Sequence, residues 1–375
     1  MLTAGSKFRA GDWVEVRSKE EILRTLDENG QLDGMPFMPE MLAFCGQKLR
    51  VYKRAHKTCD TVFPVRGRRV GNAVHLETRC DGQAHGGCQA GCLLFWKDAW
   101  LKALNGPSST GIAVPLQSLS AQSTAPQSRC TESVLRERAC VPDPDDGSPV
   151  YSCQATRLPY ATSSLDWWDL RQYFEDYSSG NVGLWRIFSG LFYSAYYNLS
   201  IAGIGVGGAM RRLYDSFHFL RGGKLFPRTL GRIPEGQSTP AATLNLQPGE
   251  FVRVKSHQEI LRTVDVHSKN RGLWWDAEMV PYCGGTYQVL KRVNKILDER
   301  TGKMREMKGP CIVLDCVVCQ SRYSGCRMFC PRAIYPYWRE IWLERVAPPV
   351  GAPRGEEKNN LAPSADPNCS QALEY

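Results

Sequence analysis

The chain has 375 residues, 42% of them hydrophobic and 23% charged, and it carries a formal net charge of +9 at pH 7. This composition excludes an intrinsically disordered protein, and the length is sufficient for two domains of ordinary size and a connection. The first residues, MLTAGSKFRAGDW, contain no charged leader followed by an apolar run, so we expect no secretory signal, a cytoplasmic location and reduced thiols.

An internal repeat organises the sequence. Residues 11–54 align without a gap on residues 249–292, with 18 identities in 44 positions. Diverged copies keep what their fold requires, so the repeat predicts two related modules, at residues 8–104 and 246–346. The shared positions include the pairs Glu40/Glu278, Met41/Met279 and Cys45/Cys283.

The first module begins with a strand and a short helix. The segment GDWVEV alternates apolar and polar residues, which predicts a half-buried strand. The next segment, SKEEILRTLD, predicts a helix that Ser18 caps and Glu21 completes as a capping box. Two more strands are expected at LRVYKR and AVHLE. An opening of the form Gly-Asp-x-Val-x-Val resembles the small SH3-like barrels, which implies a barrel of short strands.

Aromatic residues end each module, in FWKDAWL and YWREIWL. The tryptophans are four residues apart in each stretch, as Trp96/Trp100 and Trp338/Trp342. In a helix this spacing places both rings on one face, so we expect a helical pair of packing residues. The second module otherwise repeats the order of the first, with strands at FVRVK, YQVLKR and CIVLD and a helix at SHQEILRTVD.

The connection between the modules has two parts. Residues 105–164 are rich in Ser, Pro, Gln and Thr and are expected to be a linker. Residues 165–232 are expected to be helical, and their second half, from residue 180, has seven basic residues and one acid. An excess of this kind favours an anionic partner, such as a membrane surface or a nucleic acid. Residues 356–375 are expected to be a disordered tail.

An uncharged run, residues 187–210, lies within the basic segment. Three arrangements are open: a buried helical hairpin, an interfacial element whose flanking arginines meet anionic headgroups, and a transmembrane span. The run formally matches G-x-G-x-x-G at residues 203–208. A dinucleotide site would also need a preceding strand and an acid about 20 residues later. Arg228 stands near that position, so we expect close helix packing instead.

Fifteen cysteines are present, and three of them recur downstream of each repeat. Zinc is held by four ligands in a tetrahedron, and thiolates satisfy it fully. We therefore predict one zinc ion in each module, with the fourth thiolate supplied by the cysteine of the Cys-Gly pair. The predicted ligands are Cys45, Cys80, Cys88 and Cys92 in the first module, and Cys283, Cys319, Cys326 and Cys330 in the second.

Other uses of these thiols stay open. Four cysteines can also hold an iron–sulfur cluster, form disulfides or remain as buried thiols. Cys316 with Cys319 offers an alternative metal pair, whereas His85 is expected to be a loop residue and Glu40 a structural hydrogen-bond acceptor. The sequence contains no nucleotide-binding P-loop, no H-E-x-x-H motif and no nucleophile elbow.

The expected fold class is α+β, mainly β, with two homologous SH3-like barrel modules that carry cysteine-rich extensions and are joined by a partly helical segment. The expected function is that of a non-enzymatic binding or scaffold protein, stabilised by zinc and attached peripherally to a membrane, with a protein partner. One alternative is a metal- or thiol-dependent enzyme or enzyme subunit of a biosynthetic pathway. A second alternative is a nucleic-acid-binding protein that uses the basic segment.

Overall fold

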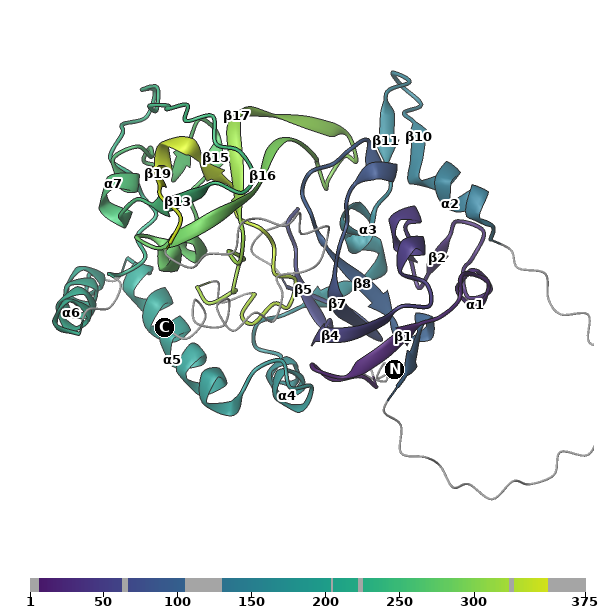
Figure 1. Ribbon diagram of the computed structural model, residues 1–375. Coiled ribbons are helices and arrows are strands. Elements are labelled where there is room, and N and C mark those ends of the chain that lie inside the picture. The colour runs from purple at the N-terminus through teal and green to yellow at the C-terminus, as the bar shows by residue number, and fades with distance from the viewer. Residues whose placement is uncertain are drawn as a thin grey trace, which may run out of the picture.

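The computed structural model describes residues 7–62, 67–104, 130–203, 205–221, 225–323 and 327–349. The fold is mixed α/β and rich in sheet, with a curled antiparallel half-barrel and several small sheets (Figure 1). Residues 105–129 of the expected linker and the expected tail at 356–375 lie outside the described residues.

The first large sheet has five antiparallel strands in the order β8-β7-β4-β1-β9. Its strands include the three predicted in the first module. Val14 and Val16 of β1 point into the core and are fully buried, as the alternating pattern requires. The strands are β1 (Trp13–Val16), β4 (Lys48–Arg54), β7 (Ala73–Arg79), β8 (Leu93–Lys97) and β9 (Leu101–Ala103).

The second large sheet has five strands in the order β18-β17-β16-β13-β19, so repeat-related strands occupy matching places in the two sheets. Strands β16 and β17 form a long hairpin that reaches across to the first half of the chain (Figure 1). At its end the backbone N–H of Gln89 donates to the carbonyl of Lys295 at 3.1 Å. The strands are β13 (Phe251–Val254), β16 (Thr286–Leu297), β17 (Met304–Leu314), β18 (Trp338–Arg339) and β19 (Leu343–Val346).

The two predicted capped helices are confirmed. Helix α1 (Lys19–Leu23) begins after Ser18, which forms a capping box with Glu21. Helix α7 (His257–Leu261) begins after Ser256, which forms the same box with Glu259. Both boxes satisfy backbone N–H groups that a helix start leaves without partners. Matching 3₁₀ turns follow, η1 (Pro39–Phe44) and η4 (Ala277–Tyr282).

The terminal tryptophans of each repeat are core residues, but their predicted helix is wrong. Trp96 belongs to strand β8, and Trp100 ends the single 3₁₀ turn η3 (Asp98–Trp100). Both rings are fully buried and pack edge-on against Phe37, at 6.2 and 5.1 Å between centroids. A strand followed by one turn brings the two rings to the same core, which spacing alone does not distinguish from a helix. The second repeat has the same turn, η5 (Glu340–Trp342).

Part of the segment expected as a linker is ordered. Residues 130–165 contain two helices and three strands, and Leu135 and Leu158 belong to the core of the first half. Their burial supplies the apolar contacts that hold this segment on the first sheet. The elements are α2 (Glu132–Ala139), β10 (Cys140–Pro142), β11 (Pro149–Tyr151), α3 (Gln154–Ala161) and β12 (Ser163–Leu165).

Four small sheets and one 3₁₀ turn complete the arrangement around the large sheets, and β10 with β11 forms one of these sheets. Strand β12 joins β5 and β6 in a three-stranded sheet, and two short hairpins follow α1 and α7. The remaining strands are β5 (Lys57–Cys59), β6 (Gly67–Arg69), β2 (Gln31–Leu32), β3 (Met35–Pro36), β14 (Lys269–Asn270) and β15 (Leu273–Trp274), and the turn is η2 (Gln83–His85).

Three helices follow β12 and lie along one side of the molecule (Figure 1). They are α4 (Arg171–Ser178), α5 (Leu184–Ile201) and α6 (Gly207–Leu220). The described residues of the glycine-rich motif, 203 and 205–208, lie between α5 and α6 and at the start of α6, and the element described before them is the helix α5 rather than a strand. None of the helices in the described part of the chain combines the length and apolarity needed to cross a bilayer.

Candidate metal centre

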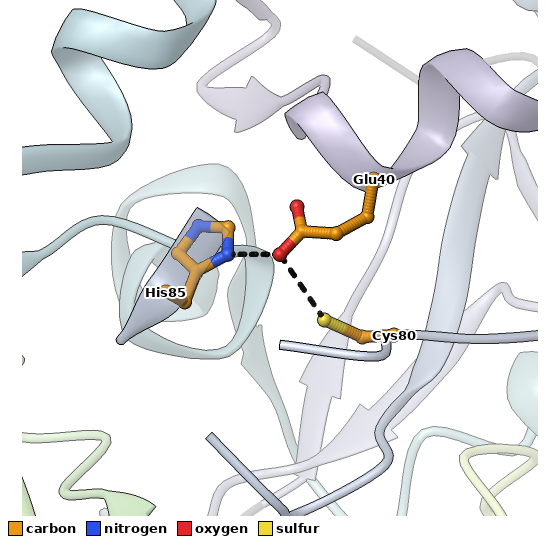
Figure 2. A group of neighbouring side chains, drawn as sticks. All are labelled: Glu40, Cys80 and His85. Carbon is orange, nitrogen blue, oxygen red and sulfur yellow. Dashed lines mark hydrogen bonds and ion pairs between the residues drawn. The ribbon is translucent and has the colours of Figure 1, made fainter. Parts of the chain in front are cut away.

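Glu40, Cys80 and His85 form a group of potential metal ligands in the first half (Figure 2). Their ligand atoms lie within 4.8 Å of one another, and no other such group occurs among the described residues. Oε1 of Glu40 is 2.6 Å from Nδ1 of His85 and 3.9 Å from Sγ of Cys80. The three side chains come from η1, the segment after β7, and η2.

A tight loop brings His85 back to Glu40. Gly82 and Gly86 flank η2, and both adopt the left-handed conformation, with φ of 74° and 63°. A Cβ on Gly82 would lie 2.0 Å from the carbonyl oxygen of Cys88. Only glycine fits this close approach, so the loop from Cys80 to Cys88 depends on it.

The Glu40 carboxylate is buried and only partly satisfied. Burial acts to raise its pKa, but the hydrogen bond from His85 and the N–H of Ala84 outweigh burial, so the pKa lies below its usual value. Its second oxygen, Oε2, is buried without a hydrogen-bond partner. A buried anionic oxygen with free lone pairs is costly unless a cation or a donor meets it. The group therefore has the charge and the free lone pairs that a metal ion requires.

Four thiols line a small cavity next to this group. Cys80, Cys88, Cys92 and Cys153 all border it, together with His85, and its volume is about 40 Å³. The N–H of Cys80 donates to the carbonyl of Cys92 at 2.9 Å, which holds the two cysteine segments side by side.

Backbone donors face two of these sulfurs. The N–H of Leu297 in β16 donates to Sγ of Cys88 at 3.3 Å. Cys153 caps the N-terminus of α3, where its sulfur meets the N–H of Thr156. Such donors stabilise a thiolate over a thiol. The cavity thus offers both sulfur ligands and the dipoles that support negative sulfur.

Without a metal ion, three of these thiols, Cys80, Cys92 and Cys153, stay protonated at neutral pH. Burial raises the pKa of Cys92 to about 11 and that of Cys153 to about 12. Burial and the nearby Glu40 carboxylate also raise the pKa of Cys80. A bound cation reverses this cost, because ligation releases the thiol protons and replaces repulsion by attraction.

The structure places the predicted fourth ligand of the first set elsewhere. Cys45 ends the 3₁₀ turn η1 and does not line the cavity. The other predicted ligands of this set, Cys80, Cys88 and Cys92, all line it. Cys153, which the sequence placed in the linker, takes part instead.

One cysteine of the second set, Cys330, is hydrogen-bonded to a residue from the first half of the chain. The N–H of Cys59, in β5, donates to Sγ of Cys330 at 3.1 Å. A hydrogen bond from Cys59 lowers the pKa of the Cys330 thiol. Sγ of Cys319 lies 3.6 Å from Oγ of Ser321. The link between Cys59 and Cys330 therefore connects the two halves of the chain at the thiols.

The remaining members of the second set are in different surroundings. Cys283 ends the turn η4, as Cys45 ends η1. Cys326 lies outside the described residues. Cys316 forms a disulfide, which overturns the expected alternative pair of Cys316 with Cys319 as metal ligands.

Sequence reasoning missed His85, Glu40, Cys59 and Cys153 as members of these groups. Two features of the sequence indicate this site: Glu40 recurs as Glu278, and His85 lies three residues before Cys88. No local pattern marks Cys59 or Cys153, because each meets its cysteine set through tertiary packing. No protein-family model, curated protein or solved structure matches the chain.

Proposed function

We propose that the chain is a non-enzymatic binding or scaffold protein made of two related SH3-like barrel modules, each stabilised by zinc. The main support for bound zinc is the group of Glu40, Cys80 and His85 beside the cavity of four thiols. The matching strand orders of the two large sheets support related modules. Two modules on one chain gain avidity when both engage a protein partner.

In the first module, the proposed ligands are Cys80, Cys88, Cys92 and Cys153. They share one cavity, they are all cysteines, and zinc prefers a closed set of four thiolates in structural sites. Cys80 contacts Glu40 in the present arrangement, so this ligand set requires its sulfur to turn toward the other three on metal binding. Glu40 and His85 then act as a supporting pair beside the metal, as second ligand shells do.

In the second module, the proposed ligands include Cys319 and Cys330, with Cys59 contributed by β5. This choice follows from the contact between Cys59 and Cys330. It makes the ion a link between the modules, so its loss would loosen their packing as well as the second barrel.

A structural role fits this site better than catalysis. A cavity of about 40 Å³ has room for very few water molecules, whereas binding sites for small molecules usually measure several hundred Å³. A set of four thiolates also leaves no open coordination position for water or substrate.

Elemental analysis of purified protein tests the proposal. We expect about two zinc ions per chain, and Cys80→Ser or Cys153→Ser should each remove about one of them and lower the melting temperature. Cys140→Ser is the matched control, because Cys140 is exposed and lies outside the cavity. Zinc lost in Cys45→Ser but kept in Cys153→Ser would restore Cys45 as the ligand. Wild-type protein with neither zinc nor iron would end the metal proposal.

A metal-dependent enzyme is the second candidate, favoured by the mixed ligands of Figure 2. A carboxylate, a thiolate and an imidazole would leave a fourth position for water, as in catalytic zinc sites. Cobalt substitution separates the two candidates, because four thiolates give an intense sulfur-to-metal absorption that a single thiolate cannot. A weak absorption that shifts when azide is added would favour the enzyme.

A further inference from the structure

Helices α5 and α6 expose large apolar side chains to solvent. Trp185 is 82% exposed, Phe192 76% and Leu220 83%. Monomeric soluble proteins rarely leave contiguous apolar patches of this kind without a partner. We therefore expect a binding partner to cover these apolar side chains.

Four of the exposed apolar residues of α5 form one helical stripe. Trp185, Phe188, Phe192 and Leu199 recur at spacings of three, four and seven residues, which places them on one face. The opposite face carries Ile187 and packs on the protein body. Helix α5 thus has two apolar faces, and the body of the protein uses only one.

The inner face of α5 is fixed by specific contacts. Ile187 belongs to a buried cluster with Met328 and Phe329 of the second half. Further along the helix, Tyr197 stacks on Phe226 with 5.4 Å between ring centroids. These contacts hold the outer stripe in a fixed direction, so its exposure is a property of the folded chain.

Helix α6 is packed on α5 and exposes its own apolar residues. The hydroxyl of Tyr196 donates to the carbonyl of Met210 at 2.5 Å, and Tyr193 meets Tyr214 with 6.0 Å between centroids. Three exposed residues of α6, Leu213, Phe217 and Leu220, again follow helical spacing, whereas Phe219 is exposed beside them. We call the two sets together the hairpin surface, defined by Trp185, Phe188, Phe192, Leu199, Leu213, Phe217 and Leu220.

The charges beside the hairpin surface are basic. Arg211 and Arg212 lie on α6, and Arg221 follows its end. Among the described residues, none of these three takes part in an ion pair, whereas Asp215, the acid of α6, is paired with Arg228. The arginines are therefore available to an anionic partner, and no unpaired carboxylate of α5 or α6 opposes them.

We propose that the hairpin surface binds an anionic phospholipid membrane, with α5 and α6 lying in the interface without crossing it. Tryptophan and phenylalanine rings favour the boundary between headgroups and acyl chains, and arginines beside them attract anionic headgroups. The basic charge argues against a second copy of this chain as the occupant, because it would bring arginines of like charge together. This inference goes beyond the zinc-stabilised scaffold and does not depend on it.

Co-sedimentation of the full chain with lipid vesicles tests the inference. We expect binding to vesicles that contain phosphatidylserine, weaker binding at high salt, and little binding to phosphatidylcholine alone. Replacing Trp185, Phe188 and Phe192 together by serine should weaken binding on the order of a thousandfold, since each of the three buried rings contributes about tenfold. These side chains are exposed in the free protein, so the variant should fold and keep its zinc content.

Two controls separate the possible results. Trp274→Ser removes an exposed tryptophan of β15, outside α5 and α6, and should bind as the wild type does. The pair Arg211→Glu and Arg212→Glu should abolish the preference for phosphatidylserine. Wild-type protein that ignores vesicles, or a triple variant that binds them unchanged, would overturn the inference. Self-association of the wild type that the triple variant loses would assign the surface to a second copy.

Discussion

Glu40 and Glu278 occupy equivalent positions in the two repeats, yet their pKa values move in opposite directions. The side chain of Glu40 is 4% exposed and Glu278 is buried, and each lies in the 3₁₀ turn of its repeat, η1 or η4. Glu40 meets His85 at 2.6 Å, and its pKa is lowered. Burial raises the pKa of Glu278 to about 7, and residues 316–330 contain no histidine. One histidine thus decides whether the same backbone position holds an anion or a group near its midpoint of titration.

A second pair of equivalent positions carries different residues in the two repeats. Gly82 and Ser321 each stand two residues after the first cysteine of their set. Both adopt a left-handed conformation, with φ of 74° and 52°. The first half uses glycine, which takes this conformation freely, whereas the second half tolerates a strained serine. The repeats therefore share a backbone turn but differ in how much room surrounds it.

Replacing Gly82 by serine should have the largest effect. The new Cβ would lie 2.0 Å from the carbonyl oxygen of Cys88, and the left-handed conformation adds strain. Backbone displacement and strain together should lower the free energy of unfolding by about 4 kcal/mol. Urea unfolding measures this change, with Gly46→Ser as a control, since Gly46 has a positive φ but no atom within 4 Å of its added Cβ. Equal losses in the two variants would show that strain alone acts at Gly82.

Glu278→Gln should change how stability depends on pH. Because the folded pKa of about 7 lies above the usual value of 4.5, the wild type loses stability as the pH rises between them. The full cost above pH 7 is about 3 kcal/mol, and glutamine removes it. The variant should therefore be more stable than the wild type at alkaline pH and similar at acid pH.

Glu40→Gln is the matched variant in the first repeat and should have the opposite sign. Its lowered folded pKa means that the carboxylate stabilises the fold at neutral pH, and this contribution disappears as the pH falls through the folded pKa. Thermal unfolding across pH measures both variants. Destabilisation of Glu278→Gln at alkaline pH would contradict the difference between the repeats.

Local features of this fold could be predicted from the sequence, whereas contacts between distant segments could not. The capping boxes at Ser18 and Ser256 depend on four consecutive residues, so the pattern identifies them. The tryptophan stretches do not identify their own structure, because a spacing of four fits both the predicted helix and a strand followed by a tight turn. The same limit applies to the candidate site. Cys80, Cys88 and Cys92 are close in sequence and were found, but the approach of Cys153 depends on how α3 packs.

Ser321→Gly is expected to have the smallest effect, and it is the reverse of the change at Gly82. Glycine relieves the left-handed strain but makes the unfolded chain more flexible, so the two contributions nearly cancel. The variant should stay within about 0.5 kcal/mol of the wild type in urea unfolding, on the stabilising side. A loss of about 2 kcal/mol would instead mean that the Ser321 hydroxyl, 3.6 Å from the sulfur of Cys319, supports the second cysteine set. In that case zinc content should fall together with stability. The first repeat would then use a glycine, Gly82, at this turn, and the second repeat would use a serine whose hydroxyl contacts the thiol of Cys319.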